Sequence, residues 1–184
     1  MTVTEQDYAW LNLLTGALFA AYAAFALFRP RTLAAAEKAF PRHRTLGLIL
    51  TAIALVWSAI FVNDMNLGGF SKYKNLLYII TPVTYYLIVQ YLDDLLAARA
   101  LGGLLMLYPV LLVDAARWIT TPDRFVLVIT AYAFVCIGIW LTLSPFKFRI
   151  WSESVAARPP LRLATGLLTA ALAAAMLAIG LTHG

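Results

Sequence analysis

Charged residues are scarce in this chain. Asp, Glu, Lys and Arg make up 12% of its 184 residues, whereas a soluble domain carries about 25%. Hydrophobic residues make up 62%, and the mean hydropathy is +0.82. This composition excludes an ordinary soluble domain and predicts an integral membrane protein.

Cysteine and histidine are also rare, which excludes several kinds of cofactor site. Cys136 is the only cysteine, so neither an intrachain disulfide nor a cysteine-ligated iron–sulfur cluster can form. His43 and His183 are the only histidines and lie outside the apolar runs, which excludes a bis-histidine haem or a His-carboxylate di-iron site inside a bundle. A glycine-rich phosphate loop and a Ser/His/Asp set are absent as well. We predict no metal, no cofactor and no catalytic residue.

What the sequence does have is a series of six apolar runs, each close to the ~20 residues that a membrane-spanning helix needs. They predict one all-α domain over residues 1–184, a polytopic membrane helix bundle with spans at residues 8–28, 45–62, 75–92, 96–116, 125–143 and 162–181. Only Asp93, Asp94 and Leu95 separate the third span from the fourth. Five spans plus a re-entrant segment therefore remain an alternative.

Basic residues gather in alternate loops. One set of loops carries ten of them, namely Arg29, Arg31, Lys38, Arg42, Arg44, Arg99, Lys147, Arg149, Arg158 and Arg162. The other set carries four, namely Lys72, Lys74, Arg117 and Arg124. Because loops rich in Lys and Arg stay in the cytoplasm, we expect both termini outside it, in what we interpret as a bacterial inner membrane. The net charge of +5 then faces anionic headgroups and does not indicate nucleic-acid binding.

Two of the cytoplasmic connections have the pattern of short interfacial helices. One is residues 30–40, and the other begins at Ser144-Pro145 and carries Phe148, Trp151 and Val155 at helical spacing. Apolar residues on one side and charges on the other are typical of a helix lying in the headgroup plane. We favour surface-lying connectors over partner-binding helices.

Small residues recur every four positions in the first and last spans. These ladders are Gly16, Ala20 and Ala24, and Gly166, Ala170, Ala174 and Ala178. Such faces let helix backbones approach closely within a bilayer. We expect the first and last spans to pack on each other, with contact to another protein as the alternative.

Polar residues inside the membrane mark a candidate binding site. The ligand-binding candidates are Asn12, Tyr78, Thr81, Tyr85, Tyr108, Asp114 and Arg117. Most come from the third and fourth spans, so we expect a pocket between those spans that opens to the outside. An acid within a span is by default a functional candidate, although Asp114 with Arg117 also fits an ordinary membrane interface. The tyrosines either anchor helices or line a groove for a lipid or quinone.

One short segment resembles a family motif. Asp94-Leu-Leu-Ala-Ala98-Arg99 is similar to the Asp-Gly-x-x-Ala-Arg core of the CDP-alcohol phosphotransferases, six-span enzymes whose clustered acids hold metals. The resemblance covers six residues. Leu95 replaces the motif's glycine, Tyr91 replaces its earlier acid, and the later acids are missing. Without those acids the sequence has no metal site of this kind.

Three functions remain open. The first is a non-catalytic membrane subunit or scaffold, whose partners are the lipid bilayer and either other membrane subunits or further copies of this chain. The second is a small transporter or channel that uses the outward pocket and Asp114. The third is a lipid- or quinone-processing enzyme that uses Asp93, Asp94 and Arg99.

Overall fold

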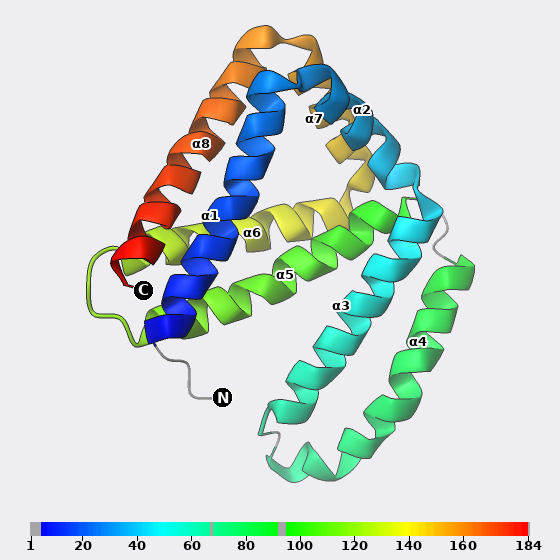
Figure 1. Cartoon of the computed structure of the whole chain (residues 1–184). Helices are drawn as coiled ribbons and strands as arrows, with labels where there is room; N and C mark the ends of the chain where they lie inside the picture. Colours follow the sequence, from blue (N-terminus) through cyan, green and yellow to red (C-terminus); the bar gives the residue numbers. More distant parts are fainter. Residues whose placement is uncertain (1–4, 67, 92–94, 184) are drawn as a thin grey trace.

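The computed structural model describes residues 5–66, 68–91 and 95–183, which are helical almost throughout and include no strand (Figure 1). Five of the described helices are long and apolar enough to cross a membrane. They are α1 (Glu5–Phe28), α3 (Arg44–Asp64), α5 (Leu96–Arg117), α6 (Arg124–Leu143) and α8 (Pro159–Thr182). The chain is therefore an all-helical protein with the character of an integral membrane protein.

The predicted span at residues 75–92 is not among these five helices. It corresponds to α4 (Leu77–Tyr91), a helix of 15 residues that follows the 3-10 segment η2 (Gly68–Leu76). At 1.5 Å per residue, α4 is roughly 22 Å long, shorter than the ~30 Å hydrocarbon core. Asp93 and Asp94 lie outside the described residues, so α4 is described only as far as Tyr91.

Short helices form at both predicted connections. These are α2 (Pro30–Ala39), followed by the 3-10 turn η1 (Phe40–Arg42), and α7 (Pro145–Ala157). Each α-helix begins with proline in its first turn, where the missing N–H costs no hydrogen bond. α2 and α7 pack side by side (Figure 1). On α7, Val155 is buried and Trp151 is 39% exposed, while the side chains of Phe148 and Arg149 lie outside the described part.

α1 and α8 run antiparallel and pack along most of their length (Figure 1). Most of the buried small residues are spaced seven apart: Ala9, Gly16 and Ala23 on α1, and Gly166, Ala173 and Gly180 on α8. Ala26, three residues after Ala23, is buried beside Gly166 as well. Leucines of the opposite helix fill the glycine positions. A Cβ on Gly16 would lie 2.9 Å from Leu177 Cγ, and one on Gly180 would lie 2.7 Å from Leu13 Cγ.

This seven-residue spacing is the geometry of a left-handed helix crossing. The predicted ladders had a four-residue spacing, so the residues that face the partner helix are not the same in the two patterns. Gly16 and Gly166 lie in the interface, and Ala20 and Ala170 are half-buried at its edge. The remaining members, Ala24, Ala174 and Ala178, are exposed.

α5 and α6 form the second close pair. A Cβ on Gly102 would lie 2.7 Å from the carbonyl oxygen of Gly138, and a Cβ on Gly138 would lie 2.7 Å from that of Gly102. α3 lies parallel to α5, because Gly47 near its start packs on Ala97 at the start of α5. The main core lies where α1, α5, α6 and α8 meet, around Leu112 and Met176.

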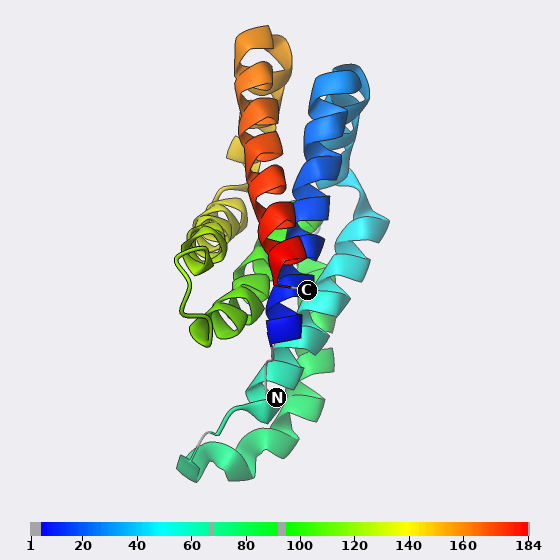
Figure 2. The same ribbon diagram turned by 60° about the vertical axis from the view of Figure 1, so that its left-hand side comes forward.

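The α3–α4 hairpin projects beyond the ends of α1 and α8 (Figure 2). α4 packs chiefly against α3, and none of its residues is buried. This is the one described helix of apolar composition that lacks a close glycine-lined contact with a neighbour. The hairpin is therefore held to the rest of the bundle mainly through α3.

Candidate functional site

A line of buried polar side chains runs along α1 where it faces α5. Tyr8, Asn12 and Thr15 are fully buried. The Thr15 and Tyr108 hydroxyls share a hydrogen bond of 2.8 Å, and Asn12 Nδ2 donates to the Tyr8 carbonyl at 2.9 Å. Within the described residues, the Tyr8 hydroxyl and Asn12 Oδ1 have no hydrogen-bond partner. Two of the predicted ligand-binding residues, Asn12 and Tyr108, thus lie in a helix interface.

Next to this line, the C-terminal end of α8 contacts the turn before α6. His183 Nε2 lies 2.7 Å from Asp123 Oδ2, and the Tyr8 ring meets the imidazole edge to face with 5.3 Å between centroids. The hydrogen bond from His183 lowers the pKa of the Asp123 carboxyl below its ordinary value. Neither residue was predicted as a site residue, because they are 60 positions apart and neither lies in a predicted span.

The first of two grooves lies between α3 and α4, and we call it the α3–α4 cleft. Its volume is about 320 Å³, and the predicted residues Tyr78 and Thr81 are in its wall. Residues not predicted before also line it, among them Val56, Ala59, Ile60, Asn63 and Lys74. Lys74 Nζ donates a hydrogen bond to the Asn63 carbonyl at the end of α3.

Two other polar groups of the α3–α4 cleft, the Tyr78 carbonyl and the Thr81 hydroxyl, are less well satisfied. Pro82 lies in its wall within α4 and has no N–H, so the Tyr78 carbonyl four residues earlier loses its helical donor. Thr81 makes no hydrogen bond to any described residue. Most threonines of the long helices behave differently: Thr51 and Thr130, for example, bond to carbonyls of their own helices at 2.7 and 2.8 Å.

The second groove, the α3–α5 groove, lies between α3 and α5 and has a volume of about 530 Å³. It brings the predicted residues Asp114 and Arg117 together with Asp64, which was not among the predicted site residues. Arg117 Nε is 3.9 Å from Asp114 Oδ1, and these side chains are 66% and 43% exposed. An ion pair as exposed as this contributes little to stability.

The predicted site is therefore divided. Asn12 and Tyr108 meet at the α1–α5 interface, Tyr78 and Thr81 line the α3–α4 cleft, and Asp114 and Arg117 line the α3–α5 groove. The sequence predicted a pocket between the third and fourth spans, which are α4 and α5. In the structure, the two grooves instead flank α3. Tyr85 is half-buried on α4 and lines neither of them.

Within the described part of the chain, no group of three or more His, Cys, Asp or Glu side chains lies close enough together to hold an ion. The acids Asp93 and Asp94 of the short family-like motif are outside the described residues. Its arginine, Arg99, has a buried Nε with no hydrogen-bond partner among the described residues.

Comparisons of the chain with protein-family models, curated proteins and solved structures find no match.

Proposed function

We propose that this protein is a non-catalytic integral membrane subunit that binds a partner membrane protein through α4. The observation that carries the proposal is the unpartnered outer face of α4, where exposed tyrosines and a glutamine lie among exposed aliphatic side chains such as Ile79 and Val83. Tyr78, Tyr86 and Tyr91 are 74%, 62% and 81% exposed, and Gln90 is exposed as well.

Four exposed residues of α4 form a continuous ridge. Tyr78, Pro82, Tyr86 and Gln90 follow one another at four-residue intervals, which places them along one side of the helix. A glutamine amide in contact with lipid chains has no hydrogen-bond partner, and such groups are typically satisfied by a neighbouring helix. A second transmembrane helix with polar side chains of its own is the partner that this ridge favours.

The course of the chain supports six crossings in this proposal. α3 and α5 lie parallel and begin at the same end, where Gly47 packs on Ala97. The chain between Asp64 and Leu96 must therefore return over the whole length of α3, and α4 is the helix that makes this return. If α3 crosses the membrane, the segment that contains α4 crosses it as well.

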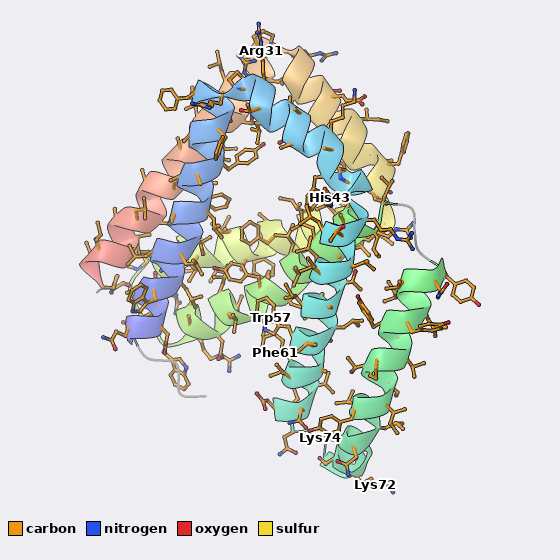
Figure 3. All side chains as sticks on the ribbon, turned by 45° about the vertical axis from the view of Figure 1, so that its right-hand side comes forward. Arg31, His43, Trp57, Phe61, Lys72 and Lys74 are labelled. Atoms are coloured by element: carbon orange, nitrogen blue, oxygen red, sulfur yellow. The ribbon has the colours of Figure 1, made fainter. Side chains whose placement is uncertain are left out.

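The orientation follows from the same arrangement and from the loop charges. The start of α1 and the end of α8 lie at one end of the bundle, where Tyr8 contacts His183. The basic segments around α2 and α7 lie at the opposite end (Figure 3). By the positive-inside rule we place α2 and α7 at the cytoplasmic surface of a bacterial inner membrane, with both termini outside.

Purification in mild detergent tests the proposal. We expect the chain to elute with a partner at fixed stoichiometry, either another membrane protein or a second copy of itself. Tyr86→Leu should weaken the association about tenfold or more, as is typical for a central interface tyrosine. Tyr132→Leu on α6 is the matched control, because Tyr132 is 66% exposed and Tyr86 is 62% exposed. A chain that purifies alone, or a Tyr86→Leu variant that keeps its partner, would contradict the proposal.

A second candidate function, transport, is favoured by the α3–α5 groove. Asp64 and Asp114 both line it at the end of the bundle that we place outside the cytoplasm. Two carboxylates against one arginine, Arg117, leave the groove with a net negative charge, which suits a cationic substrate. Uptake by liposomes that contain only this protein, abolished by Asp114→Asn, would support transport over the subunit role.

A further inference from the structure

We infer that the α3–α4 cleft binds one acyl chain of an anionic phospholipid, with Lys74 contacting the phosphate. The inference rests on the shape of the cleft, on its division into an apolar part and a polar end, and on the unused donors at that end. The lipid would occupy the space between α3 and α4, whereas the proposed partner covers Tyr86 and Gln90 farther along α4. Tyr78 and Pro82 belong to both surfaces, which meet at these two residues.

The apolar part of the cleft suits a hydrocarbon chain. Val56, Ala59 and Ile60 form its α3 wall, and Leu77 lies opposite on α4. From Val56 to Asn63 the wall rises about 10 Å along the helix axis. A volume of about 320 Å³ is near the lower limit of ~300 Å³ for small-molecule sites. The cleft therefore has room for part of one acyl chain, while the rest of the lipid stays in the bilayer.

The polar end of the cleft suits a phosphate. Lys74 and Asn63 lie where α3 ends and η2 approaches α4. The Lys74 ammonium has three donors, and it uses one of them on the Asn63 carbonyl. The remaining donors and the positive charge stay available at the level where a helix end meets the headgroups. Figure 3 shows Lys74 beside the end of α3, whereas Lys72 lies at the tip of the hairpin.

Two hydroxyl groups line the cleft next to this polar end. Tyr78 is in the first turn of α4 and Thr81 in its second, and neither side chain bonds to a described residue. In a phospholipid, the ester carbonyls follow the phosphate at this depth, and they accept hydrogen bonds from hydroxyl groups. The order of charge, hydroxyl groups and apolar wall along the cleft matches the order of phosphate, esters and acyl chain in the lipid.

A lipid titration tests the inference. The delipidated protein in detergent is titrated with phosphatidylglycerol and, separately, with phosphatidylcholine of the same chains, and the first binding event is followed by native mass spectrometry. We expect phosphatidylglycerol to bind about fivefold more tightly, the factor that one lysine contributes beside an anionic headgroup. Lys74→Gln should abolish this preference and Lys74→Arg should retain it. Lys72→Gln, in the same segment but outside the cleft, should leave it unchanged.

A second pair of variants tests the apolar part of the cleft. Ala59→Leu places a larger side chain in the α3 wall and should weaken binding of both lipids. Ala52→Leu makes the same change two turns earlier on α3, outside the cleft, and should not. Equal affinity for the two lipids, or equal effects of Lys74→Gln and Lys72→Gln, would overturn the inference. Binding of a free fatty acid without any phospholipid would overturn it as well.

Discussion

The imidazole of His183 is hydrogen-bonded to the carboxylate of Asp123, with 2.7 Å between Nε2 and Oδ2. This contact ties the last residues of α8 to the turn that begins α6. Because the Tyr8 ring packs against the same imidazole, the start of α1 joins them. One end of the bundle is thus closed by residues from three distant parts of the chain.

The pH dependence of stability should report this contact. The hydrogen bond from His183 holds the pKa of Asp123 below its ordinary value, so ionised Asp123 favours the folded state. That stabilisation is present above the ordinary aspartate pKa of ~3.9 and is lost as the pH falls through the lower folded-state value. We expect wild-type protein in detergent to melt at a higher temperature than Asp123→Asn near neutral pH, and the difference to disappear below about pH 4.

A double variant separates the contact from unrelated effects of either substitution. If the two side chains act as a pair, His183→Ala combined with Asp123→Asn should be no less stable than the less stable single variant. Additive losses would show that the two side chains act separately and would contradict the pairing.

The crossing of α5 and α6 leaves no room for a methyl group. A Cβ on Gly138 would lie 2.7 Å from the Gly102 carbonyl oxygen and 2.8 Å from Met106 Cγ. We expect Gly138→Ala to force the helices apart and to destabilise the protein by about 1–3 kcal/mol. Gly103→Ala is the control, because a Cβ at Gly103 meets nothing within 4 Å. Thermal unfolding in detergent distinguishes them, and equal melting temperatures would show that the crossing tolerates the methyl group.

The contact between α1 and α8 shows what small-residue patterns can and cannot predict. The ladders containing Gly16 and Gly166 pointed to the first and last spans as neighbours, since glycine and alanine allow close approach within lipid. They could not predict which faces meet. Contact over the whole length of two helices follows a seven-residue spacing, and this spacing brings Ala23 and Ala173 inward while Ala24 and Ala174 face outward.

The α3–α4 hairpin shows a different limit. Hydropathy identified the apolar run around α4. It cannot tell whether the neighbours of such a run are lipid or protein, because the composition is the same in both cases. The hydropathy pattern therefore did not predict that α4 would pack mainly against α3. The polar lining of the cleft was predicted only in part, since Tyr78 and Thr81 lie within the run whereas Asn63 and Lys74 lie between the predicted spans 45–62 and 75–92. Residues outside the predicted spans become site candidates only once the fold brings them together.

The hydrogen bond between Thr15 and Tyr108 should have a measurable effect on stability. It joins α1 to α5 at 2.8 Å, in the buried polar line of α1. Hydrogen bonds between membrane helices contribute on average ~0.6 kcal/mol, and up to ~1.7 kcal/mol. We expect Tyr108→Phe to destabilise the protein within that range. Tyr132→Phe should have no effect, because Tyr132 is 66% exposed on α6. A double-mutant cycle with Thr15→Val measures the pair directly, and zero coupling would contradict this role.

At the opposite end of the bundle, Glu37 of α2 should respond to pH in the reverse sense from Asp123. Burial raises the pKa of Glu37, and the hydrogen bond that it accepts from the Tyr22 hydroxyl at 3.1 Å only partly offsets this. The folded state therefore favours the protonated form. This contribution to stability is full below the ordinary glutamate pKa of ~4.3 and is lost as the pH rises through the folded-state value.

Replacing the charge at Glu37 should consequently stabilise the protein near neutral pH. Glu37→Gln keeps an acceptor for Tyr22 and removes the buried charge, so we expect its melting temperature in detergent to exceed that of the wild type by up to about 2 °C, a small value because Glu37 is only partly buried. The gain should shrink as the pH falls toward ~4, where wild-type Glu37 is itself neutral. Glu37→Ala, which loses the hydrogen bond, should be less stable than Glu37→Gln. A Glu37→Gln variant that melts below the wild type at neutral pH would mean that the carboxylate is held as an ion, with Arg162, which lines the same junction, as its counter-charge.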